Sequence, residues 1–365
     1  MFTFVKYFEK MISIQRYLSP EKWETLVQSL PYKLPTAILG HSVKGKPING
    51  HRLGTGSKKV LLWSQMHGNE STTTRALLDL LYHLDTAPGA ALLKGLTLMI
   101  IPQLNPDGAA AYTRLNANGV DLNRDAIALK EPESRILNRV FENFTPDFCF
   151  NLHGQRTIFS AGKWGKPATL SFLSPAADEK RTITPERAKA MQLIAGINKE
   201  LQPAIPDQIG RYDDTFNPNC VGDRFTSLGV PTLLFEAGHF GLDYDRNFTK
   251  EMVLKALIFA LNAIHTDGYL NHTVEEYHLI PDNEKDYVDL IIQQVDVKTE
   301  DGVYKNQELA VQYREEKTDN GIYFNPVCHS FGAKLELLSH RMANAKEILE
   351  TPLIDFSLNK SIEIS

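Results

Sequence analysis

The stretch KVLLWSQMHGNESTTTRALLDLLYHL, from Lys59 to Leu84, joins a short apolar run to an amphipathic segment. The run Lys59–Ser64 is typical of a buried strand, and the apolar residues of Thr72–Leu84 recur at helical spacing. Between them lie His67 and Glu70, two of the side-chain types that bind zinc in proteins. The stretch therefore predicts a strand, a loop with candidate metal ligands and a helix.

The same alternation of short apolar runs and amphipathic segments continues along the chain. The further predictions are strands at 96–102, 147–152 and 231–235, and helices at 131–144, 184–201 and 249–265. Apolar strands separated by amphipathic helices indicate a largely parallel or mixed sheet with helices on both faces. We therefore predict an α/β fold.

The two ends of the chain differ from this middle part. Ser19-Pro20 before EKWETLVQSL predicts an N-terminal helix at about 19–30, with Ser19 as N-cap. After Gly268 the sequence is more polar and alternating, and the turn Asp319–Gly321 indicates a hairpin. We expect an α/β domain over 1–267 and a small, mainly β domain or extension over 268–365.

Composition is that of a folded protein and disfavours several classes of partner. Apolar residues make up 42% of the chain, charged residues 23%, and the net charge is −5. This balance gives no electrostatic reason to expect nucleic acid or an anionic membrane as a partner. Lys6, Glu9 and Lys10 interrupt the N-terminal aromatic residues before a signal-peptide core forms. With no apolar run near the ~20 residues of a membrane span, we expect a cytoplasmic protein.

Polar side chains stand at the ends of four separate strand candidates. They are His67, the turn Asn105–Gly108, His153 and Glu236, and in open α/β sheets the binding crevice lies at the carboxyl ends of the strands. With Glu70, the two histidines form a His₂Glu set, the composition of a catalytic zinc site that keeps one position open for water. Zinc lowers the pKa of bound water to about 7, so Glu236 is a candidate general base for that water.

The stretch RLNANGVDLNRD, from Arg114 to Asp125, supplies cations between the second and third of these strands. An arginine near the zinc can stabilise a tetrahedral oxyanion. A second arginine beside an asparagine, Asn123-Arg124, can hold a carboxylate by a bidentate pair and a hydrogen bond. Each arginine alone could form a surface ion pair, so the prediction depends on the ordered set.

These motifs, in this order, resemble those of the zinc carboxypeptidase family (peptidase family M14) of the carboxypeptidase A type. The matching segments are GHSVKGKPI, HGNE, NPDG, R-x-N-x-x-G-V-D-L-N-R, a strand-end LHG and FEAGH, within about residues 35–265. The resemblance implies an α/β fold with a mixed, mostly parallel, twisted eight-stranded sheet. It also implies one Zn²⁺ per chain, bound by His67, Glu70 and His153.

The resemblance implies a role for each remaining site residue. Arg114 would polarise the scissile carbonyl group, and Asn123 with Arg124 would bind the terminal carboxylate of the substrate. Glu236 would activate water and pass its proton to the leaving amine. Tyr212 lies at about the distance upstream of Glu236 where family members often carry a substrate-capping tyrosine. The stretch CVGDRF, which corresponds to the family's side-chain pocket, selects no substrate side chain by its sequence.

The sequence thus predicts a zinc-dependent metallocarboxypeptidase that hydrolyses a C-terminal peptide bond. Its substrate would be a peptide or acyl amino acid with a free carboxylate. One alternative is a zinc amidase or deacylase for small N-acyl amino acids or cell-wall peptides, and a C-terminal segment that narrows the cleft would favour small substrates. The other is a non-catalytic binding module on the same fold, which would become attractive if Glu236 pointed away from the metal.

Overall fold

The structure is a computed structural model that describes residues 12–13, 16–348 and 353–355. The N-terminal residues behind the signal-peptide prediction lie largely outside the described part, so the cytoplasmic location stays a prediction. Among the described helices, none combines the length and apolar character needed to cross a membrane.

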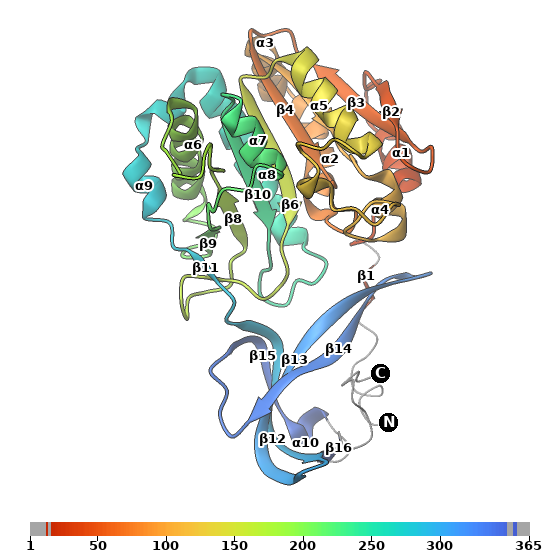
Figure 1. The fold of residues 1–365 in the computed structure, drawn as a ribbon, viewed down its shortest axis with the longest axis vertical. Coiled ribbons are helices and arrows are strands. Elements are labelled where there is room, and N and C mark those ends of the chain that lie inside the picture. Colours follow the sequence, from red (N-terminus) through yellow and green to blue (C-terminus); the bar gives the residue numbers. More distant parts are fainter. Residues whose placement is uncertain (1–11, 14–15, 349–352, 356–365) are drawn as a thin grey trace.

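An eight-stranded mixed sheet forms the centre of the larger part of the molecule (Figure 1). Its order is β2-β3-β5-β4-β6-β10-β8-β9. The strands are β2 (Ala37–His41), β3 (Pro47–Leu53), β4 (Lys58–Ser64), β5 (Leu96–Ile101), β6 (Phe148–Gly154), β8 (Leu170–Leu173), β9 (Ile209–Arg211) and β10 (Thr232–Ala237). The central strands β5, β4, β6 and β10 are parallel, and β3 and β8 run antiparallel to them. The predicted mixed, mostly parallel sheet is confirmed.

Helices cover both faces of this sheet, as predicted. Leu62 and neighbouring side chains pack with α2, α6 and α8 in the largest core, whereas Leu61 and Trp63 pack with α5 and α7. Successive strand residues point to opposite faces, so both faces are apolar because both are covered. The helices are α1 (Pro20–Gln28), α2 (Thr72–Leu84), α3 (Ala87–Gly95), α4 (Pro106–Ala111), α5 (Pro132–Phe144), α6 (Pro185–Leu201), α7 (Val221–Ser227), α8 (Asn247–Thr266) and α9 (Val274–His278), with 3₁₀ turns at Leu122–Arg124 and Gly268–Asn271.

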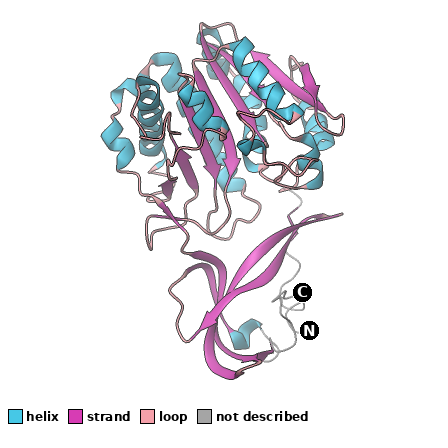
Figure 2. Cartoon of the chain, viewed as in Figure 1, coloured by secondary structure: helices cyan, strands magenta, loops and turns pink. Residues whose placement is uncertain are grey.

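A second sheet of six strands follows in the C-terminal part (Figure 2). Its strands are β12 (Tyr287–Thr299), β13 (Gly302–Thr318), β14 (Gly321–Gly332), β15 (Leu338–Asn344), β16 (Leu353–Asp355) and β1 (Ile12–Ser13), and a short helix α10 (Ala345–Ile348) lies beside it. The predicted hairpin forms between β13 and β14, with Thr318 opposite Gly321. β1 pairs with β14, so an N-terminal segment completes the C-terminal sheet.

The segment after Gly268 belongs to the larger core. Tyr269, Tyr277 and Ile280 are buried in it, and α9 packs against α6. The two-stranded pairing of β11 (Asn283–Glu284) with β7 (Ser160–Ala161) then leads into the second sheet. The division at 267/268 stays a prediction, but the mainly β structure begins after this segment.

The second sheet lies against the end of the large sheet at which β4, β6 and β10 finish (Figure 1). The side chain of Gln312 on β13 donates to Thr157 Oγ1 at 2.8 Å, just beyond β6. Tyr244, before α8, donates to Asp289 of β12 at 2.8 Å. These contacts place β12 and β13 beside the strand ends that carry the predicted site.

Candidate metal centre

His67, Glu70 and His153 lie together, and we call them the three-residue cluster. Glu70 Oε1 lies 2.8 Å from His67 Nδ1, and Glu70 Oε2 lies 2.9 Å from His153 Nδ1. The two Nδ1 atoms are 3.1 Å apart. His67 and Glu70 lie in the turn between β4 and α2, and His153 is in β6, the strand beside β4. The sheet therefore brings together ligands that are 86 residues apart.

Asp121 holds the His67 ring in place. Its Oδ1 lies 3.0 Å from His67 Nε2, so an Nε2–H donated to Asp121 leaves the Nδ1 lone pair directed at the cluster. Gly154 donates its backbone N–H to Glu70 Oε2 at 3.0 Å. The sequence prediction missed Asp121, although it lies within the GVDLNR motif, because spacing alone does not show which ring it reaches.

The donor atoms of the cluster fit a zinc ion. One atom from each residue lies within 4.8 Å of the others, and both histidines are only 2% exposed. Two imidazole lone pairs cannot face each other at 3.1 Å without a proton or a cation between them. Two nitrogens and a carboxylate oxygen are a catalytic zinc set. These three residues would hold the ion.

The electrostatics of the cluster favour positive charge on His67. Burial opposes a charge on His67, but Glu70 and Asp121 outweigh it and raise the pKa of His67 to about 9. Burial lowers the pKa of His153. Although burial alone would raise it, the pKa of Glu70 is held below its ordinary value by the two histidines. The site thus stabilises positive charge at its centre.

Glu236 faces the cluster from the neighbouring strand. It pairs in register with His153 across β6 and β10, so the two residues lie at the same level of the sheet. Burial and the nearby Glu70 carboxylate raise the pKa of Glu236 well above its ordinary value. Its Oε2 is buried without a hydrogen-bond partner among the described residues. His153 and Glu236 lie within the last two residues of β6 and β10, not beyond them, because backbone pairing continues to Gly154 and Ala237.

Arg114 lies at the edge of the cluster. Its Nη2 and Nε donate to Asp121 Oδ2 at 2.9 and 3.2 Å, and its Nη1 donates to Glu70 Oε1 at 3.4 Å. The side chain is 46% exposed, so part of the guanidinium stays open to the adjoining space. Asp121 therefore contacts both a candidate ligand and the candidate oxyanion-binding arginine.

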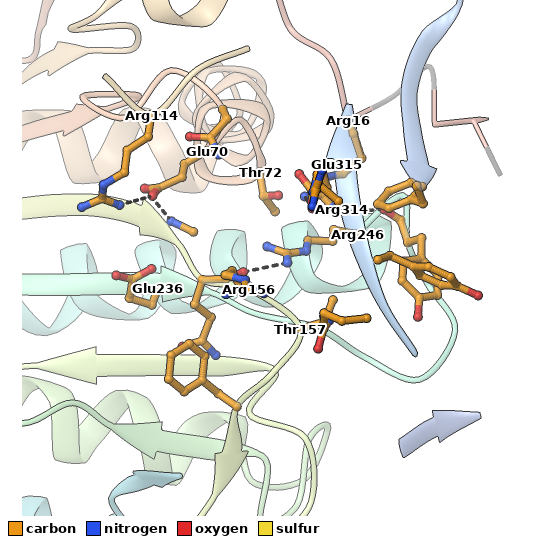
Figure 3. Close-up of a pocket in the computed structure, with 18 of the residues that line it drawn as sticks. Arg16, Glu70, Thr72, Arg114, Arg156, Thr157, Glu236, Arg246, Arg314 and Glu315 are labelled. Carbon is orange, nitrogen blue, oxygen red and sulfur yellow. Dashed lines mark hydrogen bonds and ion pairs between the residues drawn. The ribbon is translucent and has the colours of Figure 1, made fainter. Parts of the chain in front are cut away.

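A cavity of about 620 Å³, the main cavity, opens at the cluster (Figure 3). Glu70, Arg114, Tyr212 and Glu236 line one part of it, and residues of β13 and β14 line the opposite side. Tyr212 directly follows β9 and packs edge-on against Phe159, with ring centroids 5.4 Å apart. Burial and the nearby Glu236 raise the pKa of Tyr212.

Asn123 and Arg124 line a second cavity of about 400 Å³ together with Cys220 and Gly222. Asn123 Oδ1 accepts a hydrogen bond from the backbone N–H of Val221 at 2.9 Å. Arg124 Nη1 donates to the Asn123 carbonyl at 2.7 Å and contacts Cys220 Sγ at 3.1 Å. The structure thus places this pair outside the main cavity, beside the stretch expected to form the side-chain pocket.

The two cavities lie along the same face of the sheet. Asn151 and Leu234 line the second cavity. Asn151 lies two residues before His153 on β6, and Leu234 lies two residues before Glu236 on β10. Residues two apart on a strand share a face and lie about 7 Å apart. A ligand bound in the second cavity therefore comes within one strand repeat of the cluster.

The known proteins and the family profile that this chain matches in sequence are carboxypeptidases by name. The profile of the family described as zinc carboxypeptidase matches residues 21–195. The probable carboxypeptidase 2 of Trichophyton verrucosum is 32% identical over 191 residues, which cover 50% of this chain and 34% of that protein. Carboxypeptidase 2 of Trichophyton rubrum is 32% identical over 111 residues, 29% of this chain and 20% of that protein. The chain thus spans about a third or less of the length of these curated relatives.

Solved structures share the fold. A metallo-carboxypeptidase from Burkholderia cenocepacia superimposes with a TM-score of 0.55 at 22% identity, over 69% of this chain and 70% of that one. The carboxypeptidase A of Helicoverpa armigera gives a TM-score of 0.53 at 17% identity, over 70% and 74%. These solved structures show the shared fold, and the matching profile, with the ordered motifs and the cluster, shows that the α/β part of the chain belongs to the zinc carboxypeptidase family, peptidase family M14.

Proposed function

We propose that this protein is a zinc-dependent metallocarboxypeptidase that hydrolyses the C-terminal peptide bond of its substrate. The observation that carries the proposal is that Glu236 lies beside His153 in the sheet and lines the same cavity as Glu70 of the three-residue cluster. A zinc ion, when bound, would act as a Lewis acid and lower the pKa of a bound water to about 7. The remaining chemistry falls to side chains of this chain.

Glu236 is the general base in this proposal. It would take a proton from the attacking water and pass it to the leaving amine. Its burial favours proton uptake, which suits a group that must hold a proton between the two steps. Arg114 would stabilise the oxyanion, because its guanidinium is fixed by Asp121 and open on one side.

The second cavity would bind the C-terminal residue of the substrate. Arg124 and Asn123 supply the charge and the hydrogen bonds that a carboxylate needs. The scissile bond would then lie at His153 and Glu236, and the acyl half of the substrate would enter the main cavity. Tyr212, which lines that cavity, would cover the bound substrate.

The two alternatives have less support. The relatives are carboxypeptidases by name, which does not favour an amidase or deacylase. The lining of the main cavity by β13 and β14 nevertheless limits the space for the acyl half, so we propose that short peptides are preferred. In a non-catalytic binding module, the buried Glu236 carboxyl group beside the cluster would have no function.

The proposal is tested with N-benzoyl dipeptides and their C-terminally amidated forms. The zinc-loaded protein should release the C-terminal amino acid from the free acids and leave the amides intact, because only the free acids present a carboxylate to Arg124. A panel with apolar, basic and acidic C-terminal residues would show which substrate side chain is preferred, which the sequence does not indicate. Hydrolysis of the amides at equal rates, or no hydrolysis of any free acid by zinc-loaded protein, would contradict the proposal.

A further inference from the structure

The main cavity extends past the cluster into a part lined by four further arginines (Figure 3). Arg16 lies before α1, Arg156 follows β6, Arg246 precedes α8, and Arg314 is in β13. The carboxylate in this part is Glu315, which pairs with Arg16 Nη2 at 2.6 Å and accepts a hydrogen bond from the Tyr112 hydroxyl at 2.5 Å. We call this part of the cavity the arginine end, and its lining carries an excess of positive charge.

Arg246 is the buried centre of the arginine end. It is 3% exposed and donates to the backbone carbonyls of Ala237 and Gln155, both at 2.7 Å. Its Nε finds no acceptor within the described part of the chain. A guanidinium has five N–H donors, so two hydrogen bonds leave most of its capacity unused.

Among the described residues, no carboxylate forms an ion pair with Arg246. A buried arginine is ordinarily paired with a carboxylate, yet the strongest charge acting on Arg246 is that of another cation, Arg16, while the Glu315 carboxylate acts more weakly in the opposite sense. Burial and Arg16 lower the pKa of Arg246 to about 10, which still leaves it charged at neutral pH. An anion that entered this part of the cavity would meet a desolvated cation.

Arg156 adds an exposed cation to the arginine end. It is exposed and, within the described residues, forms no hydrogen bond or ion pair. The preceding residue, Gln155, accepts from Arg246 through its carbonyl, so the two arginines are linked through one strand-end loop. That loop follows Gly154, the residue after the candidate ligand His153, which places the arginine end beside the reacting centre.

The first turn of α2 borders the same space. Thr72, at the start of the helix, lines the main cavity. The Ser71 side chain does not cap this end, because its hydroxyl donates to the Arg16 carbonyl. The positive end of the helix dipole thus adds to the field of the arginines.

We propose that the arginine end is a subsite for a carboxylate on the acyl half of the substrate, within two residues of the scissile bond. The proposal rests on the proposed function, which sets the direction of the substrate: C-terminal residue in the second cavity, acyl half in the main cavity. The substrate class would then be short peptides with an acidic residue one or two positions before the C-terminal one. The wall formed by β13 and β14 keeps the acyl half short and holds its acidic group among the arginines.

The test compares three substrate-like ligands that share a C-terminal alanine for the second cavity: N-acetyl-Gln-Gln-Ala, N-acetyl-Glu-Gln-Ala and N-acetyl-Gln-Glu-Ala. All carry the same free α-carboxylate, so contacts of that group are common to the set. Calorimetry with the zinc-loaded full chain carrying Glu236→Gln, which should bind these peptides without hydrolysing them, should show one glutamate ligand binding about 10-fold more tightly than N-acetyl-Gln-Gln-Ala, the gain expected from a charge-assisted hydrogen bond to a buried cation. Affinities within 2-fold of each other would overturn the proposal.

Two arginine variants assign the effect to the arginine end. Arg156→Gln changes an exposed position and should reduce the 10-fold preference to less than 3-fold without loss of folding. Arg246→Met should reduce the preference to the same extent. Circular dichroism checks that this variant folds, because Arg246 also donates hydrogen bonds to two backbone carbonyls. The matched control is Arg52→Gln, an exposed arginine on β3 away from the cavity, which should keep the full preference. An undiminished preference in Arg156→Gln and in folded Arg246→Met would also overturn the proposal.

The binding readout separates this proposal from the proposed function. A protein that hydrolyses no peptide but keeps the 10-fold preference has the subsite without the proposed reaction. A protein that hydrolyses glutamine and glutamate peptides at the same rate, and binds the three ligands equally, has the reaction without the subsite.

Discussion

Asp121 Oδ1 lies 3.0 Å from Nε2 of His67, on the side of the ring opposite the three-residue cluster. The other carboxylate oxygen of Asp121 accepts from Arg114 at 2.9 Å. Burial alone would raise the pKa of Asp121, but His67 and Arg114 hold it well below its usual range. Asp121 is therefore an anion at every working pH, and it positions both a candidate zinc ligand and the candidate oxyanion-binding group.

Asp121→Asn should weaken zinc binding about 10- to 100-fold, the usual effect of removing a carboxylate that supports a ligating histidine. The amide can still accept a hydrogen bond, but it carries no charge to stabilise the His67 ring or Arg114. Competition with a chelator of known affinity measures the change. Unaltered zinc affinity would mean that Asp121 serves Arg114 alone.

Glu236→Gln should bind zinc like the wild-type protein and lose turnover by about 10³-fold, because the base and proton carrier is gone while the cluster is intact. Zinc content and the rate of release of the C-terminal amino acid are measured on the same sample. Near-native turnover in the variant would remove Glu236 from the reaction. Loss of zinc along with activity would instead give it a structural role.

Arg124→Ala should raise KM for peptides with a free carboxylate about 10- to 100-fold and change kcat much less, because it removes a charged contact made in the bound state. The control is Arg52→Gln, which should change neither constant. If Arg124→Ala lowered kcat and left KM unchanged, the second cavity would not be the site of the terminal carboxylate.

Zinc affinity should depend on pH through His67. The pKa of His67 without zinc is raised to about 9, above the ~6.5 of a histidine in an unfolded chain. Protonation of His67 therefore stabilises the zinc-free fold, and this contribution is fully present below about pH 6.5. It is lost as the pH rises through 9. Zinc binding needs the neutral ring and has the opposite sign. Measured between pH 7 and 9, zinc should bind about 10-fold more tightly per pH unit. A constant affinity over this range would show that His67 is already neutral.

The elements that hold the site could be predicted because each has a strong local pattern. β4 and α2 lie where the apolar run and the helical spacing placed them, and the parallel sheet then brings His67 and His153 to one edge. β8 and β9 were not predicted, because strands of four and three residues carry too little periodicity.

Features that depend on distant pairing could not be predicted. β1 joins β14 across more than 300 residues, and no local pattern in either segment indicates its partner. Arg16 and Arg246 lie in segments without a motif, and only the packed structure shows that they share a cavity. Asp121 was visible in a motif, but its contact with His67 follows from the loop conformation.

The metal centre is tested most directly by the metal content of the purified, zinc-reconstituted protein, measured by elemental analysis beside the double variant His67→Ala/His153→Ala. We expect about one zinc per chain in the wild-type protein and none in the variant. Circular dichroism on both samples shows whether the variant has kept its fold. Absence of zinc from the wild-type protein after reconstitution, or equal zinc in a folded variant, would contradict the assignment of the cluster as the metal centre.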